Sequence, residues 1–403
     1  MSESGEDLGA RLRAARGRAL TQRQLAEAAD VSVDLVRKLE QGIRKTAQIS
    51  SLARIAHAVD LDLAELMGKR ASLPGADLDA GVMALRRAVT PVDDLLGAQD
   101  QPVDESLDLT DLADLDGEIT RAWGEYWSGR WAALTAQLPE LLPRARAALH
   151  AAPLDRRPRA AECLARAYWC AGSVLVHLGQ TDTAWQAIRQ ALDTAKQGED
   201  ELLAATLRGS IGWQLLVQGR YDEARRVCAA AACSIEPSNQ STAAPERLST
   251  FGSLVLTAAT AAGRDEQRAE AEHLVDEADA IARRTGMRRD YETFFGPAQT
   301  LMQRVDVKVT SEDYVGALTA ARAMPRDSGL PLAARCRHMA DQALAHARLG
   351  HQDKALDAVL AAESAGPDWI KHQTLPRQVV AELLDTARPL RLRKLAGRLG
   401  VTV

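Results

Sequence analysis

Apolar residues recur every three to four positions along almost the whole chain, with polar residues between them. This spacing gathers the apolar side chains on one face of a helix. Strict alternation of apolar and polar residues is nearly absent, and the helix-favouring residues Ala, Leu, Arg and Glu dominate. The pattern predicts an all-α protein, and it gives no convincing strand.

The helical pattern divides the chain into three zones. Residues 1–70 hold short helices separated by turn residues, and residues 119–403 form a long helical region. Between them, residues 71–118 form a linker with one expected helix at about 77–89 and an acidic stretch that contains no Lys or Arg. A run of like charges is typical of a solvated connector.

The long helical region contains an internal repeat. A glycine ends one helix, and an alanine follows about five residues later in the next helix. The clearest copies are Gly179 with Ala184, Gly219 with Ala224, and Gly350 with Ala355, and weaker copies lie at Gly129, Gly263 and Asp313. Glycine ends a helix by adopting a left-handed conformation, and small residues allow the next helix to pack closely. The pattern resembles tetratricopeptide repeats, which implies an α-solenoid of helix pairs.

Residues 20–42, LTQRQLAEAADVSVDLVRKLEQG, contain the most specific motif. Thr21 is expected to cap a first helix, with Gln24 as its capping-box partner, and Ser32 is expected to cap a second helix that ends at Gly42. The motif resembles the helix-turn-helix of the phage-repressor (Xre/Cro-like) family, although Asp30 stands where this family usually has glycine.

The resemblance implies a five-helix, lambda-repressor-like domain, with further helices at about 8–17, 48–58 and 61–67. Its expected core consists of these apolar residues: Leu8, Leu12, Leu20, Leu25, Val36, Leu39, Leu52, Ile55, Ala56 and Leu66.

Charge supports a DNA-binding role for this domain. The whole chain has a formal net charge of -5, but Leu8 to Arg54 contains ten basic and four acidic residues. A local positive excess is what contact with phosphates requires. By resemblance, the second helix enters the major groove, so that Val33, Asp34, Arg37 and Lys38 face the bases. The remaining expected DNA contacts are Gln22, Arg23, Ser32, Arg44 and Lys45. Asp34 has an alternative role, an ordinary helix-surface pair with Lys38.

A solenoid of helix pairs forms a concave groove lined by the first helix of each pair. Six of the seven Trp lie between residues 123 and 213. The expected ligand-binding residues face this groove, and they are Trp123, Tyr126, Trp127, Arg166, Trp169, Ser173, His177 and Trp213. The alternative is that these Trp form core between neighbouring helices.

A helix-turn-helix followed by tetratricopeptide-like repeats resembles, in architecture, the peptide-sensing quorum regulators of the RRNPP type. This implies a homodimeric transcriptional regulator that binds a palindromic double-stranded DNA operator and senses a peptide or small molecule. Two alternatives remain: a regulator without a ligand, and an interaction scaffold whose repeats bind another protein.

The sequence lacks the motifs that are typical of enzymes, cofactor-binding proteins and membrane proteins. The chain has no P-loop, no dinucleotide-binding glycine motif, no H-E-x-x-H and no C-x-x-C, so neither an enzyme nor a cofactor is expected. Five cysteines fit a reducing compartment. The first residues do not resemble a signal peptide, and no run of apolar residues could span a membrane, which favours a cytoplasmic location.

Overall fold

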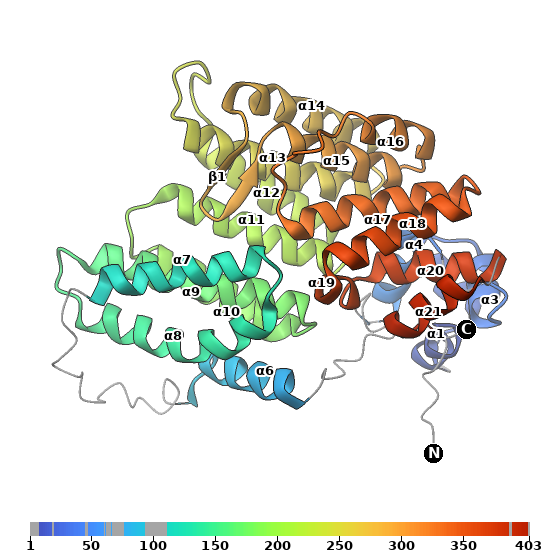
Figure 1. Cartoon of the computed structure of the whole chain (residues 1–403), viewed down its shortest axis with the longest axis horizontal. Helices are drawn as coiled ribbons and strands as arrows, with labels where there is room; N and C mark the ends of the chain where they lie inside the picture. Colours follow the sequence, from blue (N-terminus) through green and yellow to red (C-terminus); the bar gives the residue numbers. More distant parts are fainter. Residues whose placement is uncertain are drawn as a thin grey trace.

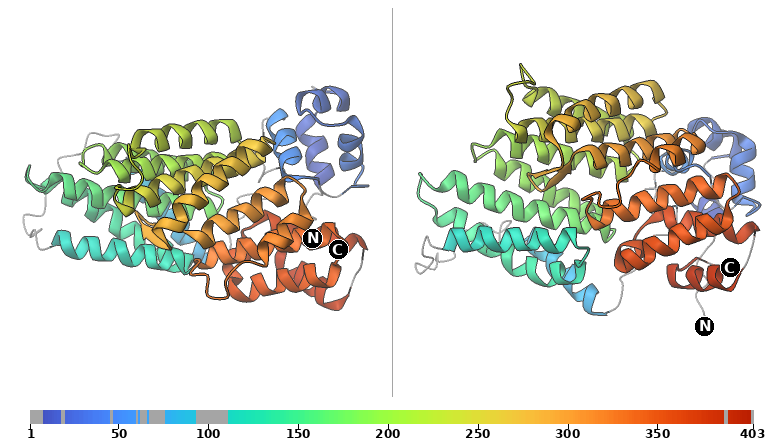
Figure 2. Two further views of the ribbon diagram at one scale, coloured as in Figure 1. Left: turned by 90° about the horizontal axis from the view of Figure 1, so that it is seen from above. Right: turned by 45° about the horizontal axis from the view of Figure 1, so that its top comes forward.

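The computed structural model describes residues 8–17, 20–44, 47–59, 61, 66, 76–92, 111–386 and 389–401. These ranges contain twenty helices and one two-stranded hairpin, so the predicted all-α class is confirmed. An N-terminal domain lies at one end of a larger body of paired helices (Figures 1 and 2). None of the described helices is both long and apolar enough to cross a membrane.

The N-terminal domain contains α1 (Leu8–Arg16), α2 (Gln22–Ala28), α3 (Val33–Glu40) and α4 (Ile49–Ala58). The predicted caps are confirmed. Thr21 accepts a hydrogen bond from the Gln24 amide, while the Gln24 side chain accepts one from the Thr21 amide, and Ser32 accepts one from the Leu35 amide. Asp30 occupies the turn with a φ of 48°, a left-handed conformation that Asp tolerates.

The predicted core of this domain is also observed, with Leu20 as the exception because it is only half-buried. The predicted fifth helix at 61–67 lies outside the described residues, apart from Leu61 and Leu66. Leu66 is fully buried in the same core.

The body consists of antiparallel helix pairs. Its helices are α6 (Ala76–Val89), α7 (Asp111–Trp127), α8 (Trp131–Ala151), α9 (Arg157–His177), α10 (Thr181–Ala195), α11 (Glu201–Val217), α12 (Tyr221–Ile235), α13 (Pro245–Arg264), α14 (Arg268–Thr285), α15 (Pro297–Thr310), α16 (Tyr314–Ala321), α17 (Leu332–Arg348), α18 (Gln352–Ala365), α19 (Pro367–Lys371), α20 (Thr374–Thr386) and α21 (Leu390–Leu399). The helix expected at 77–89 is α6. It packs against α8 and contributes Val82 and Leu85 to the core of the body.

The repeat signals mark real turns between the paired helices. Gly129, Gly179, Gly219 and Gly350 all have positive φ, as the helix-ending role requires. The expectation at Gly263 was wrong, because this glycine is buried inside α13. Glu266, with a φ of 62°, makes the left-handed turn there instead.

The expectation of no strand was also wrong. Strands β1 (Arg288–Asp290) and β2 (Thr293–Phe295) form an antiparallel hairpin between α14 and α15. Its two turn residues, Tyr291 and Glu292, have φ values of 47° and 53°, as a tight two-residue hairpin turn demands. Strands of three residues are too short to leave an alternating pattern in the sequence.

Candidate DNA-binding and ligand sites

The exposed face of α3 carries the residues predicted to face the bases. Val33, Asp34 and Arg37 are exposed, and 45% of the Lys38 side chain is exposed. An Asp34 carboxylate oxygen lies 2.6 Å from the Lys38 ammonium, and the other lies 2.6 Å from the Arg37 guanidinium. Hydrogen bonds from Lys38 and Arg37 hold the pKa of Asp34 below its usual value. The alternative helix-surface pair is therefore present, and Asp34 also orients Arg37.

Gln22, expected at a phosphate, has a different partner in the structure. Its side-chain amide donates to Glu40 over 2.7 Å, and the Arg16 guanidinium donates to the same carboxylate over 2.6 Å and 3.1 Å. The Glu40 side chain is fully buried. Burial raises the pKa of this carboxyl, but the bonds from Arg16 and Gln22 outweigh it and leave the pKa below its usual value. Glu40 thus ties α1 and α2 to the end of α3, a role that the sequence did not predict.

We expect Glu40→Ala to destabilise the N-terminal domain by about 3–5 kcal/mol, because it leaves the Arg16 charge without its buried partner. The folded pKa of Glu40 lies below its unfolded value of about 4.3. Its stabilisation is therefore present above that value and is lost as the pH falls through the folded pKa. Hydrogen exchange of the α1 and α3 amides measures the effect, with exposed Glu27→Ala as the control. Equal protection in the two variants would contradict this role.

The other predicted DNA contacts lie around α3. Arg23 is exposed on α2, Arg44 is exposed just after α3, and Ser32 uses its hydroxyl to cap α3. Lys45 lies outside the described residues. Arg54, which contributes to the positive excess of the domain, instead donates to the Ala29 carbonyl over 3.1 Å and pairs with Glu266 of the body at 2.5 Å.

The body contains a partly open cavity of about 460 Å³. The odd-numbered helices from α7 to α17 line it, as expected for the first helices of successive pairs. Seven of the eight residues predicted to bind a ligand border this cavity, namely Trp123, Tyr126, Trp127, Trp169, Ser173, His177 and Trp213. The first helices of three successive pairs, α7, α9 and α11, therefore bring these side chains to one place.

The rings of α7 and α9 pack edge to face in the cavity wall. The Trp123 and Trp169 centroids lie 4.7 Å apart at 67°, and Tyr126 lies 5.2 Å from Trp123 at 79°. The Tyr126 hydroxyl lies 3.1 Å from His177 Nε2. Burial raises the pKa of the Tyr126 hydroxyl above its usual value. Trp123 and Trp169 are 1% and 2% exposed and also belong to the core of the body. The sequence left two alternatives for these Trp residues, core between helices and wall of a ligand groove. In the structure, Trp123 and Trp169 belong to both the core and the cavity wall.

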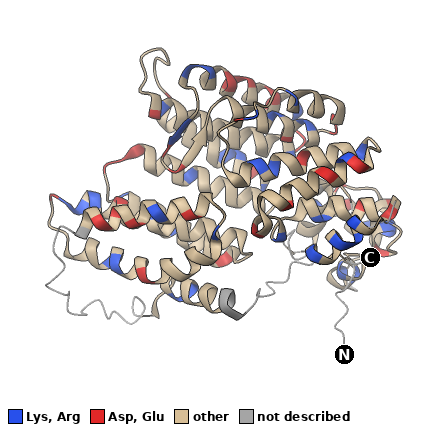
Figure 3. Cartoon of the chain, viewed as in Figure 1, with Lys and Arg blue, Asp and Glu red and all other residues tan. Residues whose placement is uncertain are grey.

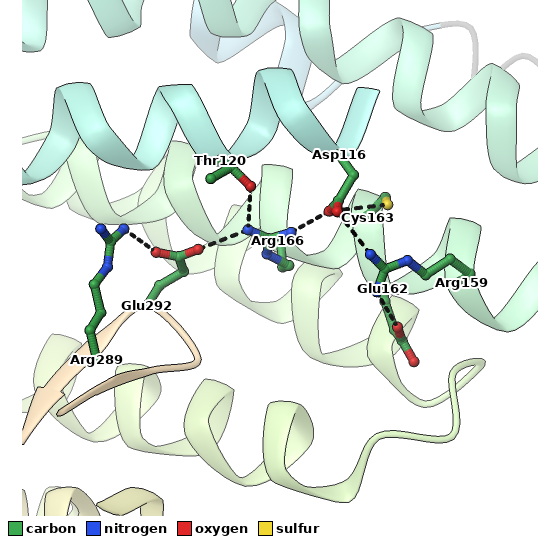
Figure 4. Close-up of polar contacts among 8 residues, drawn as sticks. All are labelled: Asp116, Thr120, Arg159, Glu162, Cys163, Arg166, Arg289 and Glu292. Carbon is green, nitrogen blue, oxygen red and sulfur yellow. Dashed lines mark hydrogen bonds and ion pairs between the residues drawn. The ribbon is translucent and has the colours of Figure 1, made fainter. Parts of the chain in front are cut away.

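Arg166, the eighth predicted residue, lies apart from this cavity. It lines a second cavity of about 340 Å³, separated from the first by Trp169 and Glu292, which border both. Arg166 donates to Glu292 over 2.8 Å and to Thr120 over 3.1 Å, and it also pairs with Asp116 (Figure 4). It links α9 to α7 and to the hairpin.

The charged residues from α13, α15 and α17 that border the first cavity form ion pairs. Arg337 lies 2.6 Å from Asp306 and 2.9 Å from the buried Asp341, and Arg264 lies 3.7 Å from Asp306. Burial raises the pKa of Asp341, and the two carboxylates raise that of Arg337 despite its own burial. Over the rest of the body, basic and acidic residues are interspersed along the helices (Figure 3).

Comparisons with known proteins bear on the N-terminal domain. Residues 7–67 match the family described as "Helix-turn-helix domain". No curated protein is significantly similar to the chain. Among solved structures, the chain is similar to Bacillus thuringiensis PlcR in complex with the peptide PapR7 and DNA. That similarity has 12% identity and a TM-score of 0.36, and it covers 88% of this chain and 99% of that one. The family match and the capped α2–α3 pair identify residues 7–67 as a helix-turn-helix domain, which precedes a body of paired helices.

Proposed function

We propose that the chain is a transcriptional regulator that binds a palindromic DNA operator as a homodimer, with α3 in the major groove, and that a ligand in the first cavity changes its affinity for DNA. Arg37 and Lys38 reach guanine edges or phosphates, and Val33 packs against a thymine methyl. Arg23 and Arg44, with Lys45, contact the backbone on either side.

One observation carries the coupling between the two parts. Ala53 of α4 is 5% exposed and belongs to the same buried cluster as Leu215, Leu216 and Tyr221 of the body. Leu216 and Tyr221 also line the first cavity. The seat, defined as Leu215, Leu216, Tyr221, Ala224 and Ala261, is therefore both the docking surface of the DNA-binding domain and part of the ligand cavity wall.

Polar contacts hold the domain on this seat. Arg54 pairs with Glu266 at 2.5 Å, the Gln378 side chain donates to the Ala47 carbonyl over 3.2 Å, and Gln48 donates to Glu312. The contacted residues lie in α20 and in the turns that follow α13 and α15. The domain is thus fixed by several parts of the body, and a shift in any of them changes the position of α3.

Through the seat, a ligand in the first cavity can change the position of the DNA-binding domain. Close packing transmits a small displacement, since a side chain pushed outward from the cavity must move its neighbours. A ligand that displaces Leu216 or Tyr221 favours a conformation in which Ala53, and with it the DNA-binding domain, has a different position relative to the body. By linkage, DNA binding then changes the affinity for the ligand by the same factor.

Substitution of Ala53 by Trp tests the seat. Little space separates Ala53 from the turn at Gly219 of the body, because a Cβ built on Gly219 would lie 3.3 Å from the Ala53 Cβ. We expect A53W to displace the domain, to raise hydrogen exchange in residues 211–224, and to change DNA affinity about tenfold or more, as a coupling of 1–3 kcal/mol implies. His57→Trp, at an exposed position of the same helix, is the matched control.

Three outcomes separate the candidate functions. If A53W raises exchange at the seat but leaves DNA affinity unchanged, the seat does not control α3 and the coupling is refuted. If no small molecule or peptide alters DNA affinity, the ligand-independent regulator is favoured. An interaction scaffold would show no sequence-specific DNA binding by the unaltered chain.

A further inference from the structure

We propose that the first cavity takes a compact, uncharged aromatic molecule with hydroxyl or carbonyl oxygens, which lies against the β1–β2 hairpin. The inference deepens the proposed function and rests on its assignment of this cavity to a ligand. It excludes an extended peptide threaded along the concave side of the body.

The shape and lining of the cavity favour fused rings. Its volume of about 460 Å³ lies within the range of small-molecule sites. Trp127, Trp169 and Trp213 border it from three successive first helices, and Phe294 adds a ring from the hairpin. Aromatic rings pack edge to face or offset against other rings, which stabilises a flat aromatic guest beyond its apolar area.

Hydroxyl groups provide the polar contacts. Ser173, Ser210 and Ser253 border the cavity, one each from α9, α11 and α13. Each hydroxyl can donate to a carbonyl or accept from a hydroxyl of the guest. An apolar pocket with a few convergent polar groups orients a small molecule.

The charges argue against an ionic guest. The charged Arg and acidic residues among the described lining of the cavity are Arg264, Glu292, Asp306 and Arg337, and each has an opposite charge beside it. Glu292, for example, is only 9% exposed and pairs with Arg166 at 2.8 Å and with Arg289 at 2.5 Å. A charged group of a ligand, including a peptide terminus, would have to replace one of these paired charges and leave its partner without a counter-charge, which is costly.

The hairpin closes the path that an extended chain would need. Both ends of the hairpin contact α13: at its base the Phe295 ring packs against Gly252, and next to its turn Asp290 accepts a hydrogen bond from Ser249 over 2.5 Å. Its tip reaches α9 through the Glu292–Arg166 pair, seen in Figure 4. Phe294 packs edge to face on Trp127, with centroids 4.9 Å apart. The hairpin therefore bridges α7, α9 and α13 across the concave side.

The probes are 2-naphthol, 2-naphthoate and a pool of random heptapeptides, titrated calorimetrically into the full-length chain at pH 7. The two naphthalenes share one ring system and differ in charge. We expect 2-naphthol to bind with a Kd of about 10–100 µM, 2-naphthoate to bind at least tenfold more weakly, and the heptapeptide pool not to compete. Ser210→Trp, which fills the cavity, should weaken 2-naphthol binding at least tenfold. Arg226→Trp, at an exposed position of α12, should not. Circular dichroism verifies that both variants fold.

Each departure from these results overturns the inference. Absence of 2-naphthol binding up to 1 mM refutes an aromatic guest, as does equal or tighter binding of 2-naphthoate or of heptapeptides. Binding that survives Ser210→Trp places the guest elsewhere. Trp213→Leu is a second, milder variant that should also weaken binding if Ser210→Trp fails to fold. If 2-naphthol binds as expected but DNA affinity does not respond, the coupling in the proposed function fails while the ligand class stands.

Discussion

Substitution of both Arg37 and Lys38 by alanine is expected to weaken binding to the operator by about 100-fold or more at fixed salt. Each good contact to a base edge contributes about 1–3 kcal/mol of discrimination, and two lost contacts combine to this range. The variant also removes two positive charges near phosphates, so the salt dependence of binding should become shallower. Fluorescence anisotropy with labelled duplex DNA, measured at several salt concentrations, gives both quantities.

The same change leaves the fold of the domain intact. Val36 and Leu39 form the buried side of α3, whereas Arg37 and Lys38 contact Asp34 on its surface. Lys196→Ala with Arg226→Ala is the charge-matched control, because both residues are exposed on the body. If the control weakens DNA binding as much as the α3 variant does, net charge and not α3 determines the affinity.

Substitution of Gly252 by alanine is expected to destabilise the body by about 3 kcal/mol and to detach the hairpin. A Cβ at this position would lie 2.1 Å from the Phe295 Cζ and within 2.8 Å of two more ring atoms. The Phe295 ring, now 1% exposed, would have to leave its site, and loss of a buried Phe typically costs 3–5 kcal/mol. Urea unfolding followed by circular dichroism measures the loss.

Gly124→Ala is the matched control, since Gly124 also lies within a helix and its added Cβ would meet nothing within 4 Å. Alanine there should stabilise the chain by about 0.5–1 kcal/mol, because it favours helix more than glycine does. The two identical substitutions thus have opposite expected signs. A stable Gly252→Ala variant with a well-ordered hairpin would show that Phe295 adapts without cost.

The features that the sequence predicted best depend on local chemistry. Thr21, Gln24 and Ser32 cap their own helices, and the turn glycines act within a few residues, so nearest neighbours decide their conformation. The wall of aromatic side chains was also accessible to prediction, because the turn glycines set the helical register of Trp123, Trp169 and Trp213.

The features that it missed depend on partners distant in the chain. Glu40 is a charged residue, which is usually expected on the surface of a protein. Only the folded domain brings the Arg16 and Gln22 side chains to it. Arg54 has the charge of a DNA contact, but Glu266 lies 212 residues away along the chain. The hairpin is short, and Gly252, which receives its Phe295, carries no sequence mark that distinguishes it from other helix glycines.

Selection of binding sites from a pool of random duplex DNA by the full-length chain tests directly whether α3 reads a DNA sequence. We expect enrichment of one sequence with two related half-sites about one helical turn apart, and we expect this enrichment to be lost in the Arg37→Ala, Lys38→Ala variant. Selection without any enriched sequence, or the same enrichment by the variant, would contradict the assignment of α3 as the DNA-reading helix.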